Sequence, residues 1–195
     1  MIHKATLSTL VLGLTLTAAV APTSADDGGA KPPATTSTQA TPAAKAESPL
    51  FGKFTSAVTE PEKQVRQKAV DQAVSEIFFA LRGMGRKRVE AKTHIPAWVE
   101  IKQSGQTVTF HFEGRQPEPC PLQGSTKGKD PDGKEAEFSA RQEGQKLIQT
   151  VKTEDGQRTN VFVPQADGSM KLNVELKSER FKTPIRYTIS YKRQK

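Results

Sequence analysis

The strongest constraint on this chain is a two-residue rhythm of apolar side chains between residues 97 and 193. In the stretch GSMKLNVELKS, Met170, Leu172, Val174 and Leu176 alternate with charged or amide residues. Only an extended strand places every second side chain on one face. This part of the chain must therefore form β-strands with one apolar face that requires burial.

The same rhythm recurs in seven segments, and an eighth strand is possible around residues 120–128. In one of these segments, RTNVFVPQADG, we expect Thr159, Val161 and Val163 to share the apolar face. Gly-containing turn signals separate the segments, and Gly supplies the positive φ that tight hairpins require. The sequence therefore predicts an up-and-down antiparallel meander of 7–8 strands. The connection 116–134, rich in Pro, Gly and charge, is expected to be a mobile loop.

A helix is predicted over residues 60–82, ahead of the strands. Thr59 and Glu62 have the spacing of a capping box, and Pro61 suits a first helical turn. Apolar residues then recur at offsets of three, four and seven as far as Leu81, and the glycines at 83 and 85 are expected to end the helix. A meander with one apolar face must curl or be covered. We therefore expect a mainly β barrel or half-barrel with one amphipathic helix packed on its apolar face or plugging an open end.

The N-terminal part differs in composition from the rest of the chain. Residues 1–25 combine one firm charge at Lys4, an apolar run and an alanine-rich zone, which is typical of a secretory signal peptide. The alternative, a retained anchor, is disfavoured because the run falls short of the ~20 residues that span a bilayer. Residues 26–55, rich in Pro, Ala and Thr, predict a disordered linker, and residues 56–195 the folded domain. The expected location is periplasmic or secreted, with no transmembrane helix after signal removal.

The C-terminal half carries a family resemblance. The run GQKLIQTVKTEDGQRTNVFVPQADGSMKLNVELKSERFKTPIRYTISYKR is similar to the closing half of lipocalin-like domains in exported bacterial proteins. The order of strands, DG hairpins and the PIRY…YKR segment carries this likeness. The resemblance implies a lipocalin-like β-barrel, and most members of such families have no assigned activity.

No residue pattern for catalysis or metal binding is evident in the sequence. Beyond the signal segment the histidines are His94 and His111, which lack the spacing of a zinc site or a partner nucleophile. Cys120 is the only cysteine, so it is either a buried small apolar residue or a thiol that pairs between molecules. We therefore expect a non-enzymatic protein with no catalytic residues, no metal and no cofactor.

One hypothesis is a binding protein that holds an apolar or lipid-like small molecule inside the curled sheet. A cavity lined by inward aromatic and aliphatic residues would be mostly apolar, with phenolic hydroxyls to orient a ligand. The candidate ligand-lining residues are Phe110, Phe112, Phe138, Leu172, Val174, Tyr187 and Tyr191.

The alternative hypothesis is an envelope interaction or structural protein with a dry core. The chain carries a net charge of +8, which favours anionic partners such as envelope components. Nucleic acid is an unlikely partner because Tyr187 and Tyr191 alternate inward, away from the basic residues. An ordinary solvated rim would explain the same charges. The candidate anion-binding residues form two clusters, Arg82, Arg86, Lys87 and Arg88, and then Arg186, Lys192 and Arg193.

Overall fold

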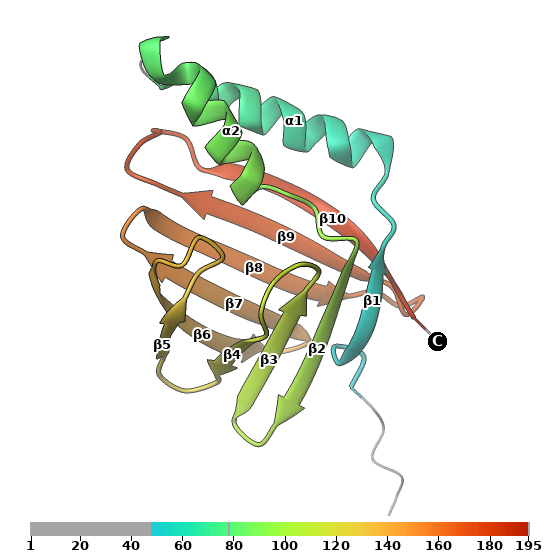
Figure 1. Ribbon diagram of the computed structural model, residues 1–195. Helices are drawn as coiled ribbons and strands as arrows, with labels where there is room; N and C mark the ends of the chain where they lie inside the picture. The colour runs from blue at the N-terminus through green and yellow to red at the C-terminus, as the bar shows by residue number, and fades with distance from the viewer. Residues whose placement is uncertain (1–47, 78, 195) are drawn as a thin grey trace, which may run out of the picture. The chain divides into compact units, whose positions relative to one another are not determined.

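The chain forms ten antiparallel strands in one continuous sheet, and seven of them are the alternating segments (Figure 1). The computed structural model describes residues 48–77 and 79–194, so the expected signal peptide and most of the expected linker lie outside the described residues. The strands are β1 Gly52–Ser56, β2 Trp98–Ser104, β3 Thr107–Phe112, β4 Glu118–Pro121, β5 Thr126–Lys129, β6 Glu135–Glu143, β7 Lys146–Thr153, β8 Gly156–Pro164, β9 Met170–Lys177 and β10 Ile185–Arg193.

The strand order β4-β3-β2-β1-β10-β9-β8-β7-β6-β5 curls the sheet into a nearly closed barrel. The wall is joined through β1, where Phe54 lies opposite Val99 of β2 on one side and Arg193 of β10 on the other. The edge strands β4 and β5 are not hydrogen-bonded to each other, although β4 lies close to β5 and β6. Every neighbouring pair is antiparallel, which confirms the predicted antiparallel pairing.

The expectation of 7–8 strands was wrong, because three short strands carry almost no alternating pattern. β4 has the sequence EPCP and β5 the sequence TKGK, so neither shows a run of apolar residues, and both lie in the connection expected to be a loop. β1 reads GKFTS, with Phe54 as its single large apolar residue. All but the last residue of this strand lie within residues 26–55, so the expected linker overlaps the first strand of the barrel.

The expected single helix over residues 60–82 is two helices. α1 spans Glu60–Ser75, a 3-10 turn covers Phe79–Leu81, and α2 spans Arg82–Lys92. The predicted capping box is present, since the carboxylate of Glu62 accepts a hydrogen bond from Thr59 N–H at 2.8 Å.

The glycines that were expected to end the helix lie inside α2. A Cβ on Gly85 would come 2.6 Å from Ile77 Cδ1, so Gly85 lets α2 fold back closely against the end of α1. The apolar stripe continues past the chain reversal, which is why periodicity alone suggested one longer helix.

The helices lie beside the β9–β10 wall (Figure 1), and α1 packs against β10. Val70, Ala73 and Val74 of α1 are buried in the same core as the barrel side chains. At one end of α1, Ser190 Oγ of β10 donates a hydrogen bond to Glu62 at 2.7 Å. At the other end, the Glu76 carboxylate accepts from the Lys182 and Thr183 main-chain N–H groups at 2.6 and 3.1 Å. These contacts fix α1 along β10.

The barrel interior is densely filled by aromatic and aliphatic side chains near β3 and β8. The rings of Phe110 and Phe162 stack with centroids 5.1 Å apart, and Phe112 stacks on the same Phe162 ring at 6.5 Å. Cys120 is buried among them as a free thiol, and burial raises its pKa to about 12. The buried position favours the small apolar role over pairing between molecules.

The described part of the chain contains no helix long and apolar enough to cross a bilayer. Within residues 48–77 and 79–194, no group of three or more His, Cys, Asp or Glu side chains is arranged to hold a metal ion.

Candidate functional site

A cavity of about 440 Å³ opens where the C-terminal turn of α2 meets three loops of the barrel. The loops are those between β5 and β6, between β7 and β8, and between β9 and β10. Val89, Val151, Leu176 and Phe181 supply apolar lining. The volume falls in the range of about 300–1,000 Å³ that is typical of small-molecule sites. We call this opening the mouth of the barrel.

A layer of polar side chains crosses the barrel below the mouth. Strand register places Tyr187, Val174, Asn160 and Gln149 in one inward row across β10, β9, β8 and β7. Asn160 Nδ2 donates to Gln149 Oε1 at 2.7 Å, and Gln149 Nε2 donates to Glu118 Oε2 at 2.7 Å. These buried hydrogen bonds link β7 to β4 across the gap in the sheet. They supply a connection where main-chain pairing is absent.

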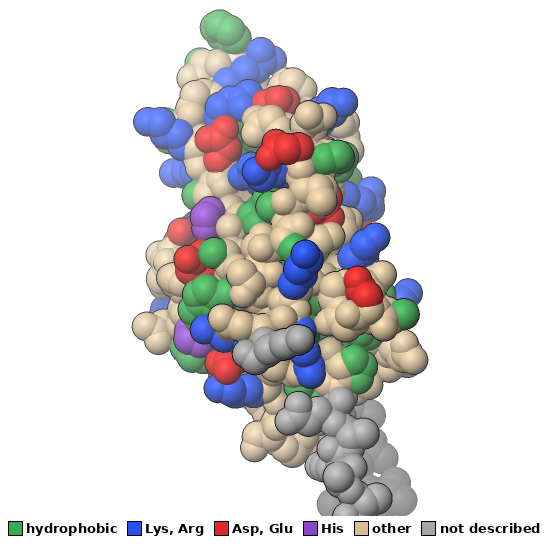
Figure 2. Space-filling view, turned by 90° about the vertical axis from the view of Figure 1, so that its right-hand side faces the viewer, with side chains coloured by type: hydrophobic (Ala, Val, Ile, Leu, Met, Phe, Trp, Pro, Cys, Tyr) green, Lys and Arg blue, Asp and Glu red, His purple; other side chains and the backbone are tan. Residues whose placement is uncertain are grey.

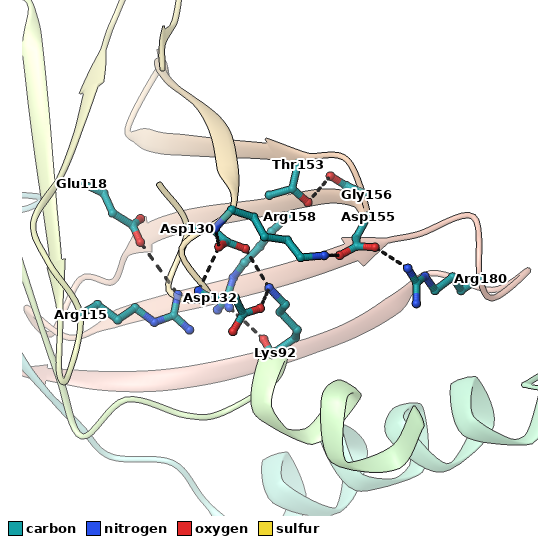
Figure 3. Close-up of polar contacts among 11 residues, drawn as sticks. Lys92, Arg115, Glu118, Asp130, Asp132, Thr153, Asp155, Gly156, Arg158 and Arg180 are labelled. Carbon is teal, nitrogen blue, oxygen red and sulfur yellow. Dashed lines mark hydrogen bonds and ion pairs between the residues drawn. The ribbon is translucent and has the colours of Figure 1, made fainter. Parts of the chain in front are cut away.

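Two arginines bring positive charge into this layer (Figure 3). Arg158 of β8 donates from Nε to Asn160 Oδ1 at 3.0 Å and from Nη1 to the Lys92 carbonyl oxygen at 3.0 Å. The Arg115 side chain is only 17 % exposed, and its guanidinium lies 5.6 Å over the Phe112 ring. Burial lowers the pKa of Arg115, and repulsion from Arg158 lowers it further. The two guanidinium groups are therefore close enough to oppose each other's charge.

Glu118 is the carboxylate nearest to Arg115, at 4.0 Å between Oε1 and Nη1. Burial raises the pKa of Glu118, and attraction to Arg115 only partly offsets this effect. A carboxyl group that is harder to ionise compensates less of the neighbouring positive charge. The layer thus holds two guanidinium groups and one carboxyl group that is difficult to ionise. This excess of positive charge favours binding of an added anion.

The hydroxyl of Tyr187 is buried and has no hydrogen-bond partner within residues 48–77 and 79–194. The hydroxyl of the neighbouring inward tyrosine, Tyr191, instead donates to the Pro96 carbonyl at 3.2 Å. Buried polar groups in native proteins are almost always paired, so an unpaired hydroxyl indicates a missing ligand or water. Tyr187 also lies within electrostatic range of Arg115.

Ion pairs join the segments around the mouth. Lys92 at the end of α2 binds Asp130 at 3.0 Å and also contacts Asp132 in the β5–β6 loop (Figure 3). Asp155 in the β7–β8 turn binds Lys134 of the β5–β6 loop at 2.5 Å and Arg180 of the β9–β10 loop at 2.6 Å. We call these contacts the mouth latch, because together they connect α2 and all three loops.

The latch carboxylates are stabilised in their charged form. Burial acts to raise the pKa of Asp130, but hydrogen bonds from Lys92 Nζ and from the Lys134 main chain outweigh it and hold the pKa below its usual value. The hydrogen bond from Lys134 lowers the pKa of Asp155. Burial acts to lower the pKa of Lys92, yet its two aspartate partners raise it overall. The latch is therefore charged across the neutral pH range.

A second hollow of about 660 Å³ lies outside the barrel, between α1 and the outer faces of β8, β9 and β10. Its lining includes Val65 of α1 and the outward residues Thr159, Val161 and Thr188. The side chains expected on the apolar face of β8 are therefore outside, which corrects the predicted phase of this strand. Arg158 and Asn160 lie on the inner face of β8. Val161 and Val163 lie on the outer face, and their alternation suggested the wrong face as the buried one.

The seven predicted ligand-lining residues are all buried, with 4 % exposure or less. They lie on inward positions, and none of them is among the residues that line the 440 Å³ cavity. Phe110 and Phe112 pack against Phe162 deeper in the barrel, whereas Tyr187 sits in the polar layer. Their role in lining a ligand stays a prediction. The residues are Phe110, Phe112, Phe138, Leu172, Val174, Tyr187 and Tyr191.

The predicted anion-binding residues lie in two separate places. Arg82, Arg86, Lys87 and Arg88 are on α2, where Figure 2 shows cationic side chains gathered around the helical end. Arg86 is paired with Asp71 at 2.7 Å and Glu90 at 3.5 Å.

The second predicted cluster is on β10. Arg186 binds Glu175 at 2.6 Å, Lys192 is exposed, and Arg193 contacts the Phe51 carbonyl and the Phe54 ring. Two of these three cations thus already have partners in the fold.

The chain matches no protein-family model and no curated protein sequence. Its fold is similar to that of Caenorhabditis elegans lipid binding protein 8, at 12% identity and a TM-score of 0.50, covering 76% of this chain and 98% of that one. This likeness shows a shared β-barrel fold. A secretory abundant heat soluble protein of Ramazzottius varieornatus is similar at 10% identity and a TM-score of 0.50, covering 75% of this chain and 96% of that one. A Schistosoma mansoni fatty acid binding protein is similar at 18% identity and a TM-score of 0.47, covering 76% of this chain and 98% of that one.

Sequence reasoning missed the polar residues of the site: Arg115, Glu118, Gln149, Arg158 and Asn160. One signal was available for Gln149, because it stands two residues from both Leu147 and Val151, on the predicted inward face of β7. A polar residue on an otherwise apolar face indicates either a buried network or a ligand contact. The other four could not be placed, because β4 was not recognised and the phase of β8 was inverted.

Proposed function

We propose that the barrel binds an amphipathic anion with an apolar tail, the chemical class of fatty acids. The unpaired, buried hydroxyl of Tyr187 carries this proposal, because it lies within electrostatic range of Arg115, which in turn feels the charge of Arg158. A carboxylate placed there would accept hydrogen bonds from all three side chains. Charge-assisted bonds of this kind are roughly twice as strong as neutral ones.

The charge balance of the polar layer supports an anionic head group over a neutral one. Buried charges are normally paired, and an unpaired guanidinium is unfavourable in a low-dielectric interior. Glu118 attracts both guanidinium groups and Asp132 attracts Arg115 more weakly, but burial raises the pKa of Glu118. A ligand carboxylate would restore the balance.

The lining of the mouth suits the apolar part of such a ligand. Val89, Val151, Leu176 and Phe181 line the cavity above the polar layer. The structurally similar Caenorhabditis elegans protein is named for lipid binding, which agrees with this assignment. The apolar run and alanine-rich zone of residues 1–25 motivate export as part of the proposal, so the ligand would be met in the periplasm or outside the cell.

A displacement titration tests the proposal. The full chain is loaded with a fluorescent fatty acid and titrated with oleic acid, then with its neutral methyl ester. We expect the acid to displace the probe and the ester to be weaker by about tenfold or more, because it cannot form charge-assisted bonds with the guanidinium groups. Equal potency of acid and ester, or no displacement by any fatty acid, would contradict the proposal.

A variant pair locates the head group. Arg115→Gln is expected to weaken binding of the acid by about tenfold or more while leaving the ester unchanged. Arg141→Gln is the matched control, since Arg141 lies on the outer face of β6 and pairs with Glu143 in solvent. If both variants bind the acid equally well, the head group lies elsewhere.

A further inference from the structure

The connection between the helices exposes an unusual share of apolar surface. Four large apolar side chains are exposed in the described part of the chain, Val65 at 53 %, Phe79 at 78 %, Leu81 at 52 % and Met84 at 59 %. Three of the four lie within six consecutive residues, in the 3-10 turn and the first turn of α2. We call residues 79–88 the helical tip. A single exposed apolar residue needs no explanation, but such a group marks an interaction surface.

The helical tip is also strongly cationic. From Ile77 to Val89 the sequence contains four cations and no Asp or Glu. Lys87 and Arg88 are exposed and form no ion pair with another residue of the described part of the chain. The guanidinium of Arg82 lies 5.7 Å over the Phe79 ring, so charge and apolar surface are directly adjacent.

A neighbouring loop extends the positive charge of this end. Glu76 at the end of α1 accepts hydrogen bonds from the main chain of Lys182 and Thr183, which holds the β9–β10 loop beside the α1–α2 connection. Lys182 is exposed there. Figure 2 shows a hydrophobic side chain at the extreme of this end with cationic side chains below it.

We propose that the helical tip docks on a lipid bilayer that contains anionic lipids. Apolar side chains enter the boundary between head groups and acyl chains, while Lys and Arg beside them meet the negative head groups. The absence of carboxylates from residues 77–89 removes the repulsion that an anionic surface would otherwise meet. Docking of the tip does not depend on the proposed fatty acid site, so either proposal can fail without the other.

Vesicle partitioning of the full chain tests the apolar part of the tip. The triple variant Phe79→Ser, Leu81→Ser, Met84→Ser is compared with the control Val65→Ser, which removes the fourth exposed apolar residue from α1. The triple variant should lower partitioning into phosphatidylcholine vesicles with phosphatidylglycerol by about tenfold or more, because three apolar side chains that would enter the bilayer are lost. Val65→Ser should change it by less than about twofold, since this single side chain lies outside the tip. Unchanged partitioning of the triple variant would overturn the proposal.

A second pair tests the charge. Lys87→Gln with Arg88→Gln should lower partitioning by about 25-fold, or about fivefold for each cation. The control is the double variant Lys127→Gln, Lys171→Gln, which removes the same charge from exposed positions on β5 and β9. It should have little effect on partitioning. An equal loss for both pairs would show that net charge alone attracts the protein, and would overturn docking by the tip.

A fluorophore reports where the protein touches the membrane. Cys120 is buried, so a cysteine introduced at Gly83, where an added Cβ meets nothing within 4 Å, is the accessible thiol among the described residues. The environment-sensitive dye NBD at Gly83→Cys should shift to the blue when anionic vesicles are added. The same dye at Lys146→Cys, on β7, should not shift. A shift at Lys146→Cys as large as at Gly83→Cys, or no shift at Gly83→Cys, would overturn the assignment, even if residues 1–47 bind lipid themselves.

Discussion

Arg158 Nη1 donates a hydrogen bond to the carbonyl oxygen of Lys92 at 3.0 Å. One side chain thus joins the inner wall of β8 to the last residue of α2. The same guanidinium also donates a hydrogen bond to Asn160 in the polar layer. Arg158 therefore connects the candidate site directly to the helix that borders the mouth.

Arg158→Gln is expected to loosen α2. Loss of the bond to the Lys92 carbonyl leaves an end-of-helix acceptor without its partner, and bonds from charged donors contribute about 1.5–3 kcal/mol. Amide hydrogen exchange should become faster in residues 82–92 than in the wild type, with a smaller change in α1. Arg141→Gln is the control on the outer face of β6, and an unchanged exchange pattern in Arg158→Gln would show that the bond does not hold the helix.

The two inward tyrosines should respond differently to removal of the hydroxyl. Tyr191→Phe loses a bond to the Pro96 carbonyl, so the free energy of unfolding should fall by about 1 kcal/mol. Tyr187→Phe removes a buried hydroxyl that has no partner in the described part of the chain, so stability without ligand should stay equal or rise. Urea denaturation of both variants checks this. A clear loss of stability in ligand-free Tyr187→Phe would mean that its hydroxyl already has a partner, such as a bound water.

Asp130→Asn should lower stability in a pH-dependent way. The Asp130 carboxylate accepts bonds from the main-chain N–H groups of Asp132 and Lys134, both at 2.9 Å, and from Lys92 at 3.0 Å. Its pKa is lowered in the folded state, so its stabilising contribution is present above the usual value of 3.8 and is lost as the pH falls further. We expect the variant to be about 1–3 kcal/mol less stable at pH 7. The difference should shrink below a pH of about 4.

Glu118→Gln should show the opposite pH dependence of the free energy of unfolding in the same denaturation experiments. Burial raises the pKa of Glu118, so its contribution is present below the usual value of 4.5 and is lost as the pH rises through the folded-state pKa. The stability of the glutamine variant relative to the wild type should therefore increase as the pH rises. Parallel pH profiles for Asp130→Asn and Glu118→Gln would contradict both assignments.

Asp155→Asn should speed ligand exchange with little effect on stability. Its partners Lys134 and Arg180 are about half exposed, and such pairs contribute only about 0–1 kcal/mol. They nevertheless connect three loops around the mouth, so their loss should raise the rate of probe release. Stopped-flow dilution of a bound fluorescent fatty acid measures that rate. Glu143→Gln breaks the similar exposed pair with Arg141 away from the mouth, and it should release the probe at the wild-type rate.

Gly156→Ala should be strongly destabilising. Gly156 has a φ of +146°, and an added Cβ would lie 2.0 Å from the Lys177 carbonyl oxygen. Strained backbone and overpacking each destabilise by about 1–3 kcal/mol. Gly83→Ala is the matched control, because nothing lies within 4 Å and helix propensity favours alanine by about 1 kcal/mol. Thermal unfolding that ranks the two variants in the reverse order would refute the close approach at Gly156.

The architecture was predictable wherever apolar periodicity was strong. The alternation in Met170–Lys177 and in Ile185–Arg193 predicted strands β9 and β10. Their inward residues are buried as expected, except for the partly buried Leu176. In the region of β4 and β5 the sequence indicated at most one strand, around residues 120–128, because a strand at the edge of a sheet can consist of Pro, Gly and Lys and still pair through its main chain. The chain reversal after α1 escaped prediction, since the close contact between Gly85 and Ile77 is a tertiary feature.

The candidate site was less predictable than the fold. A mostly apolar lining with phenolic hydroxyls was expected, yet the layer below the mouth also holds the charged residues Arg115, Arg158 and Glu118. Arg115 lies outside any strand, and its burial depends on β4 and β8 closing around it. Residues that become neighbours only through this closure leave no local signal. The basic residues of α2 were visible as a cluster. Of the exposed apolar residues that accompany them, Leu81 was interpreted as part of a core-facing stripe.

The seam of the barrel has a consequence for the order of assembly. β1 must pair with β10. Phe54 therefore pairs with Arg193, which lies almost the whole length of the folded part away in the sequence. During synthesis, hairpins such as β6–β7 can form early, whereas β1 keeps one edge unsatisfied until the final strand emerges. Pairings between such distant segments slow folding because a long loop must close first. The nascent protein should therefore stay open, and accessible to chaperones, until its last strand is made.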